Sequence, residues 1–343
     1  MLSNPDRSRL AVTWSNAVSA NVKKMILIFF ACVAAVGCSN VEDTTLNTRG
    51  ESHTREEFPS RIEAEHLPNA IRIHKRVISG GQPDGKAAFE ELQSLGVKTI
   101  ISVDGAKPDV VSAAKFGMRY IHLPHGYNGI PDQRAAELAK AVRDFKGPIF
   151  IHCHHGKHRS PTAAAVACVS NGMLEPTAAT KILQLAGTSE NYVGLYQSAA
   201  SARRIDDQLL DSLKADFPEI AELPPFAEAM VELEHTFDHL KRLAVADWKL
   251  LEKHPDLDPA HEALLLMEHF TEMLRMESVA KEPAEFRSML EQSKMDSQTL
   301  ESLVRERLTN ANIRSSEIDE PFKRLSTNCA ACHKLFRDVP LSR

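Results

Sequence analysis

The sequence predicts an α/β domain followed by an all-α four-helix bundle, and three observations carry this prediction. First, strand-like apolar runs alternate with helical patterns over residues 67–200, as is typical of helices packed on a central sheet. Second, strand patterns disappear from residues 225–343. Third, this second part contains four amphipathic stripes with helical spacing and short links, which favours a helix bundle.

The beginning of the chain has the pattern of an export signal. Two lysines precede the apolar run Met25 to Val36, which is too short to form a stable membrane-spanning helix. The tetrapeptide Ala-Val-Gly-Cys that ends at Cys38 resembles a bacterial lipobox. That resemblance implies cleavage before Cys38, a lipid on this cysteine and a periplasmic or extracytoplasmic protein anchored to the membrane. An ordinary cleaved signal peptide over residues 1–38 is the alternative.

The elements of the first domain follow a predicted tether. Residues 39–66 are polar and charged without an apolar period, which indicates a flexible segment. Residues 201–224, charged with interspersed leucines, are predicted to be a helical connector to the second domain. Between them we expect strands at 71–78, 98–103, 119–123 and 148–151, and helices at 109–115 and 132–145. A further helix, with Phe89, Leu92 and Leu95 facing inward, is expected to follow the turn at Asp84 and to end at Gly96.

The chemistry of this domain is concentrated in the loop after its last strand. Cys153 and Arg159 bracket five residues, and small helix formers follow, so the loop lies at a helix N-terminus. Gly156 permits a tight turn, and the backbone N–H groups of the loop can then converge on one point. That point suits a phosphate dianion, and the same field favours Cys153 as a thiolate nucleophile.

Arg159 and Ser160 complete the predicted catalytic group. The planar guanidinium of Arg159 can bind two phosphate oxygens at once, which lysine cannot copy. Ser160 can donate a hydrogen bond to the cysteine sulfur and help it leave. A metal site formed by the loop histidines is the alternative to a basic rim that favours a polyanionic substrate. The loop residues predicted to bind phosphate are His154, His155, Gly156, Lys157, His158 and Arg159.

The order His-Cys-x5-Arg-Ser resembles the phosphate loop of the cysteine-dependent protein tyrosine and dual-specificity phosphatases. The Gly-Lys-His-Arg ending is most similar to their plant-and-fungal atypical branch. The resemblance covers about residues 68–200. It implies hydrolysis of a phosphate ester through a cysteinyl-phosphate, with a phosphorylated protein or an inositol phosphate as the substrate.

The sequence departs from this family at the general acid. Typical members have an aspartate well before the cysteine, but the corresponding stretch here, Leu123 to Gly129, contains no carboxylate. Asp132 is the nearest carboxylate and our first candidate for the acid, although it could instead cap the following helix. His125 and Asp104 remain open as alternatives.

The last amphipathic stripe contains the sequence Cys329-Ala-Ala-Cys332-His333. Two thiols on one helical turn can add to the two vinyl groups of a haem, and His333 can then bind the iron as an axial ligand. A redox dithiol usually follows a strand, and a zinc site would need further ligands, so these alternatives fit less well. We therefore predict covalent haem c.

This motif on the last helix of a bundle resembles cytochrome c′ and its relatives, and Arg337 also fits their pattern. The resemblance implies electron transfer or gas and redox sensing, with a redox partner or a diatomic gas. It also implies a five-coordinate iron covered by Leu233, with Met230 as a rival ligand.

Composition bounds these interpretations. The net charge of −5 gives no general attraction to nucleic acid. The six cysteines do not form a disulfide pattern, because most of them have another assignment. The sequence thus predicts an exported phosphatase joined to a haem domain. The alternative is a haem-based sensor or electron carrier whose first domain only binds a phosphorylated ligand.

Overall fold

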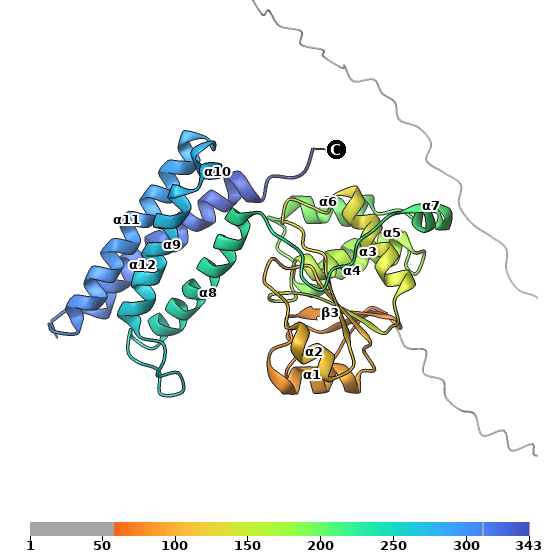
Figure 1. Cartoon of the computed structure of the whole chain (residues 1–343), viewed down its shortest axis with the longest axis horizontal. Coiled ribbons are helices and arrows are strands. Elements are labelled where there is room, and N and C mark those ends of the chain that lie inside the picture. The colour runs from red at the N-terminus through yellow and green to blue at the C-terminus, as the bar shows by residue number, and fades with distance from the viewer. Residues whose placement is uncertain (1–57, 311, 343) are drawn as a thin grey trace, which may run out of the picture. The chain divides into compact units, whose positions relative to one another are not determined.

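The computed structural model describes residues 58–310 and 312–342 (Figure 1). The predicted export signal, the lipid-modified Cys38 and most of the predicted tether lie outside the described residues. In the part of the chain that the structure describes, no helix combines the length with the apolar composition needed to cross a membrane.

A six-stranded sheet in the order β1-β2-β3-β6-β4-β5 forms the centre of the first part of the chain. The pairs β1–β2 and β2–β3 are antiparallel, and β3, β6, β4 and β5 run parallel. Along β6, Ile149 and Ile151 face one apolar core and Phe150 faces the other, because successive side chains point to opposite sides. The strands are β1 (Ser60–Arg61), β2 (Ile71–His74), β3 (Val77–Gly81), β4 (Thr99–Ser102), β5 (Arg119–His122) and β6 (Ile149–Cys153).

Helices cover both faces of this sheet, which confirms the predicted α/β arrangement (Figure 1). Phe89 of α1 and Ala113 of α2 belong to one core, and α3, α4, α5 and α6 contribute to the other. The helix end predicted at Gly96 is also confirmed, since this glycine has φ +78°, which it adopts without strain. The helices are α1 (Gly85–Ser94), α2 (Val110–Lys115), α3 (Asp132–Asp144), α4 (Arg159–Ser170), α5 (Pro176–Ala186) and α6 (Val193–Ser201).

The end of the predicted tether is part of the sheet. Strand β1 pairs with β2, and the Ile62 N–H donates to the carbonyl of Ala70 at 2.9 Å. Ile62 and Ala64 also pack against the core that contains Phe89. Two apolar residues in a polar stretch are too few to show a period, so the sequence did not indicate this strand.

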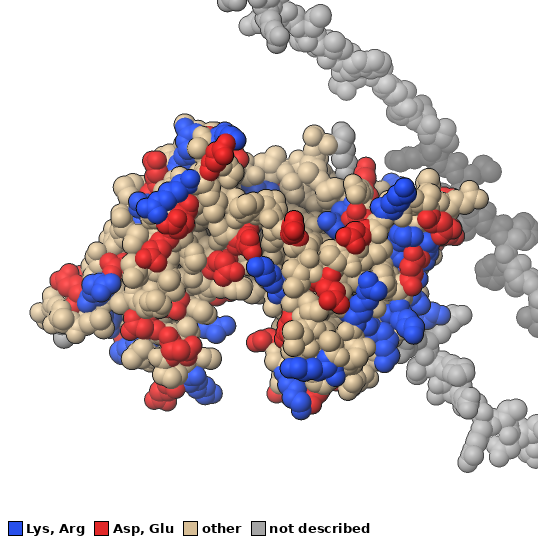
Figure 2. Space-filling model, in the orientation of Figure 1, with Lys and Arg blue, Asp and Glu red and all other residues tan. Residues whose placement is uncertain are grey.

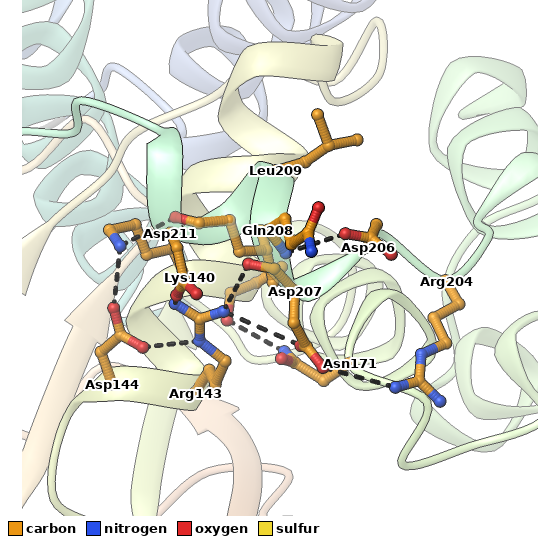
Figure 3. A network of polar contacts seen from close by, with 12 residues as sticks. Lys140, Arg143, Asp144, Asn171, Arg204, Asp206, Asp207, Gln208, Leu209 and Asp211 are labelled. Atoms are coloured by element: carbon orange, nitrogen blue, oxygen red, sulfur yellow. Dashed lines mark hydrogen bonds and ion pairs between the residues drawn. The ribbon is translucent and has the colours of Figure 1, made fainter.

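The connector at residues 201–224 is less helical than the sequence predicts. Its only helix in the structure is α7 (Asp207–Ser212), which polar contacts hold against α3 (Figure 3). Arg143 pairs with Asp211 at 2.7 Å, and the Lys140 ammonium donates to the carbonyl of Leu210 at 2.9 Å. Leu210 is the buried residue of this helix, so most of the connector's leucines do not form an apolar face.

The second part of the chain is helical throughout its regular elements, as predicted. Asp258 caps α9 by accepting a hydrogen bond from the N–H of His261 at 2.8 Å. Helix α12 ends at Cys332 and continues into a π-helical turn. The elements are α8 (Pro225–Val245), α9 (Pro259–Arg275), α10 (Glu277–Ala280), α11 (Ala284–Arg307), α12 (Ser315–Cys332) and η1 (His333–Arg337).

The four long helices share one apolar core. Leu240, Phe270, Leu300 and Leu325 come from α8, α9, α11 and α12 respectively, and all four are buried in it. Helix α11 runs without a break through Asp296. The buried carboxylate of Asp296 accepts from Arg324 of α12 at 2.7 Å, which explains how a charge is accommodated there. Figure 2 shows basic and acidic side chains interspersed over the surface on the face it displays.

Candidate active site

The predicted loop lies where the central strand β6 meets α4. The strand ends at Cys153 and the helix begins at Arg159, so five residues turn between them, as expected. Gly156 has φ +72°, and a Cβ at this position would overlap the backbone nitrogen of Gly81. Only glycine therefore fits where the loop crosses the end of β3.

Cys153 and Ser160 face each other at the base of this loop. The sulfur of Cys153 lies 3.3 Å from the Ser160 hydroxyl, which also donates to the carbonyl of Gly80 at 2.9 Å. Cys153 is 3% exposed and Ser160 is fully buried. Ser160 can thus turn its proton towards a sulfur that carries negative charge.

Arg159 is held by Asp104, which follows strand β4. Their ion pair measures 2.8 Å, and the same carboxylate oxygen accepts from the backbone N–H of His154 at 2.6 Å. Burial opposes ionisation of Asp104, but the charge of Arg159 and the N–H groups of Ala106 and His154 outweigh it and lower its pKa to about 2. A carboxyl that is ionised at neutral pH has no proton to donate, so here Asp104 positions Arg159 and the loop.

The other two acid candidates are Asp132 and His125, and the hydrogen bonds that the Asp104 carboxylate accepts come from other residues. Asp132 is exposed on the first turn of α3, where Pro131 occupies the cap position predicted for it. His125 follows β5, and its Nδ1 lies 2.9 Å from the carbonyl of Gly126. Burial, followed by the charge of Arg159, lowers the pKa of His125 to about 4. Asp132 as the general acid therefore stays a prediction.

Two histidines of the loop, His155 and His158, do not supply the positive charge that the sequence predicts for its rim. Burial and then the charge of His154 lower the pKa of His155, and burial and then His155 lower the pKa of His158 to about 4. His154 lies 3.5 Å from Asp238 of α8. Lys157, the other residue predicted for this rim, belongs to the turn between β6 and α4. Burial is the main cause of the lowered pKa values of His155 and His158, and residue type alone does not show which histidines are buried.

Tyr127 is a part of the site that the sequence analysis missed. The guanidinium carbon of Arg159 lies 4.5 Å from the centre of its ring, and that of Arg337 lies 4.2 Å from the same ring. Tyr192 and His158 pack beside Tyr127. Residues 127 and 337 are far apart in the chain, so no local spacing could have brought them together.

Replacing Asp104 should destabilise the protein and change its response to phosphate. Asp104→Asn leaves the buried Arg159 charge without its partner, which typically costs about 3 kcal/mol of unfolding free energy. Added phosphate should restore part of this loss, because it can pair with Arg159. Thermal melts with and without phosphate measure both effects. Asp132→Asn is the matched control and should change stability by less than about 0.5 kcal/mol; equal melts for both variants would contradict the positioning role.

The stability of the protein should fall between pH 6.5 and pH 4. His152 is buried, with its Nε2 2.6 Å from the Tyr120 hydroxyl, and burial lowers its pKa to about 4. The unfolded chain then binds the proton more tightly, so stability is full above about pH 6.5 and decreases as the pH falls to 4, by roughly 3 kcal/mol for one such histidine. Protonation of Asp104 lowers the stability in a separate pH range, below about pH 4, because its pKa in the folded protein is about 2. A melting temperature that is constant from pH 6.5 to pH 4.5 would contradict this account.

The residues of the predicted haem motif lie together at the end of α12. Cys329 and Cys332 occupy one helical turn, both are free thiols, and His333 begins the following π-helical turn. Both cysteines contact the apolar core of the helical part, which also includes the neighbouring rings of Phe226, Phe286 and Phe336. Two unpaired thiols next to an imidazole and an apolar surface are the donor set that haem c requires, so the residues fit this group.

The two residues considered as a cover or a ligand for the iron belong to the same apolar core as Cys332. Leu233 is buried in the same core and Met230 packs partly against it, as does Phe336 of the π-helical turn. Within residues 58–310 and 312–342, no set of three or more His, Cys, Asp or Glu side chains could hold a metal ion. A haem iron differs from such a site in needing one or two protein ligands, because the porphyrin supplies the others.

The first part of the chain thus presents a cysteine, an arginine and a serine around a glycine-containing loop at the ends of the parallel strands of a mixed sheet. No protein-family profile matches the chain. It is 30% identical over 112 residues to inositol diphosphatase DSP4 of Arabidopsis thaliana, a match that covers 29% of this chain and 54% of that protein. The chain therefore spans about half the length of this relative.

Two groups of solved structures are similar to the same part of the chain. A cysteine-to-serine variant of TpbA from P. aeruginosa in complex with pTyr matches with 19% identity and a TM-score of 0.38, covering 46% of this chain and 96% of that one. The core catalytic domain of the PP-IP phosphatase SIW14 from S. cerevisiae, in complex with citrate, matches with 16% identity and a TM-score of 0.36. That match covers 44% of this chain and 92% of the yeast chain.

Proposed function

We propose that the chain is a cysteine-dependent phosphatase that hydrolyses a phosphate ester through a cysteinyl-phosphate. The observation that carries the proposal is the buried Cys153, 3.3 Å from the Ser160 hydroxyl, on a loop that Arg159 closes. The sulfur attacks phosphorus while the bond to the leaving oxygen breaks, and Arg159 and the loop N–H groups stabilise the equatorial oxygens. Water then attacks phosphorus, and Ser160 donates to the departing sulfur.

The state of Asp104 favours substrates whose leaving group needs little protonation. This carboxylate contacts the loop but is ionised, with a pKa of about 2. Aryl oxides and phosphates leave more readily as anions than alkoxides do, so a phosphotyrosine or a phosphoanhydride suits the site better than an alkyl phosphate. The similarity to an inositol diphosphatase supports inositol phosphates as one substrate class, with a phosphorylated protein as the other.

We propose further that the helical part is a cytochrome c′-like four-helix bundle with covalent haem c. Cys329 and Cys332 would form the thioether bonds, and His333 would bind the iron. When bound, haem supplies a redox-active iron that can also take a diatomic gas. Leu233 is buried in the same core and cannot ligate iron, which favours a five-coordinate centre, with Met230 as the rival ligand. A redox partner or a gas such as NO would then be the signal or electron source.

The proposed location follows from the beginning of the chain. Residues 1–38 would direct export and Cys38 would carry a lipid that anchors the protein to the membrane on its periplasmic or extracytoplasmic side. Haem c attachment takes place outside the cytoplasm in bacteria, so export and the haem motif support each other.

A second candidate function is a haem-based sensor or electron carrier whose first part only binds a phosphorylated ligand. The ionised state of Asp104 favours this second candidate. The carboxylate that contacts Arg159 then has no proton to donate to a leaving group. The intact group of Cys153, Arg159 and Ser160 opposes it, since binding alone does not require a nucleophile.

The test is to assay the purified, haem-loaded full chain against a phosphotyrosine peptide, an aryl phosphate and inositol polyphosphates. A phosphatase should release phosphate from at least one of them. Tight binding of these compounds without any release would instead favour the sensor or carrier.

A further inference from the structure

Arg337 belongs to the helical part of the chain but lies at the phosphate loop. Its guanidinium carbon is 4.2 Å from the centre of the Tyr127 ring, and the same ring contacts Arg159 at 4.5 Å. Two guanidinium groups that share one tyrosine ring are close neighbours. The proposed catalytic site therefore has a second arginine beside it, which comes from the turn that follows the haem motif.

The two arginines differ in how a ligand can reach them. The side chain of Arg159 is 9% exposed, and that of Arg337 is 36% exposed. Arg337 pairs with its neighbour Asp338 through Nε at 2.7 Å. A guanidinium has five N–H donors in a planar fork, so Arg337 retains donors for another anion.

Two backbone hydrogen bonds hold the segment that contains Arg337 in place. The N–H of Asp338 donates to the carbonyl of His333 at 2.8 Å, which closes the π-helical turn. Further on, the N–H of Leu341 donates to the carbonyl of Asn128 at 2.9 Å, next to Tyr127. The segment after the helices is thus fixed to the loop that carries Tyr127, and Arg337 lies shortly before this contact in the chain.

The charges around the loop leave few directions for a large anion. On the side of α8, the carboxylate of Asp238 lies beside His154. The negative charge of Glu234 favours the charged forms of His155 and Arg159. An anion that extended towards α8 would meet these carboxylates. An anion that extended over Tyr127 would meet Arg337.

We propose that Arg337 binds a second phosphate group of a small polyphosphorylated molecule whose first phosphate occupies the loop of Cys153 and Arg159. This rests on the proposed function insofar as the first phosphate is the one hydrolysed. The Tyr127 ring contacts both guanidinium groups and so brings the two arginines to one side of the loop. The second arginine makes the site selective for compounds with more than one phosphate over those with a single phosphate.

The test measures binding rather than turnover, in the full chain with the nucleophile removed. Calorimetry on Cys153→Ser gives the affinities for inositol hexakisphosphate and for inorganic phosphate. Adding Arg337→Gln should weaken binding of the hexakisphosphate about tenfold or more, as expected for a lost charge-assisted contact, and leave inorganic phosphate within about twofold. Arg337→Lys should restore part of the affinity, because it keeps the charge but not the fork.

Lys334→Gln is the matched control, since it removes one positive charge from an exposed residue of the same turn. It should bind both compounds like its parent, and melting temperatures should be equal for the two glutamine variants. Unchanged hexakisphosphate affinity in Arg337→Gln would overturn the proposal. Equal losses for the hexakisphosphate and for inorganic phosphate would also overturn it, because Arg337 would then support the loop itself.

The result of this binding test can be distinguished from the result of the phosphatase assay. Arg337-dependent binding by a chain that releases no phosphate from any substrate would reject the phosphatase and keep the second phosphate site. Phosphate release that Cys153→Ser abolishes, together with hexakisphosphate binding that does not depend on Arg337, would support the phosphatase and reject the second phosphate site.

Discussion

Cys153→Ser should abolish phosphate release, lowering turnover by at least about 10³-fold, because a serine hydroxyl in this loop is not ionised and does not attack phosphorus. Phosphate or vanadate should still bind, since Arg159 and the backbone N–H groups are unchanged. Assays with an aryl phosphate measure the first effect, and calorimetry with phosphate measures the second. Retention of full activity would show that Cys153 is not the nucleophile.

Arg159→Lys should lose both phosphate affinity and rate, which distinguishes it from the cysteine variant. Lysine keeps the charge but cannot bind two oxygens in one plane or reproduce the 2.8 Å pair with Asp104 in the same geometry. The same two measurements apply, with Lys157→Arg as a control for charge-preserving changes in the loop. A variant that kept its phosphate affinity but lost rate would show that Arg159 stabilises the transition state and does not contribute to phosphate binding.

Cys329→Ala combined with Cys332→Ala should remove haem from the chain completely. Thioether bonds to these two sulfurs would hold haem through denaturation, so the wild type should retain haem peroxidase staining on a denaturing gel and the double variant should not. Cys168→Ala is the control, because Cys168 is a free thiol buried in the α/β core, away from the motif. It should retain the stain.

Two results would contradict covalent attachment. One is haem that acid-acetone extracts from the wild type, and the other is a double variant that still stains. Either result would favour a redox dithiol as the role of Cys329 and Cys332. The two residues are free thiols on one helical turn.

The sequence by itself determined the features that depend on near neighbours. Period and apolar runs located the strands β4, β5 and β6 and all four long helices, because each such element must bury a face. They predicted one strand over residues 71–78, where the structure forms the antiparallel pair β2 and β3. Local spacing also located the loop from Cys153 to Arg159 between a strand and a helix, and placed Cys329, Cys332 and His333 together. It missed β1 and overestimated the helix in the connector, where few apolar residues give a pattern.

Only the tertiary structure decided which distant groups meet at the loop and which of them are charged. Parallel pairing of β4 with β6 brings Asp104 to Arg159, and packing of the C-terminal segment brings Arg337 to Tyr127. Burial then lowers the pKa of His158, which residue type alone would count as part of a basic rim. The physical reason is that pairing across a fold and desolvation depend on the whole packed arrangement, whereas local spacing depends only on the geometry of one turn or strand.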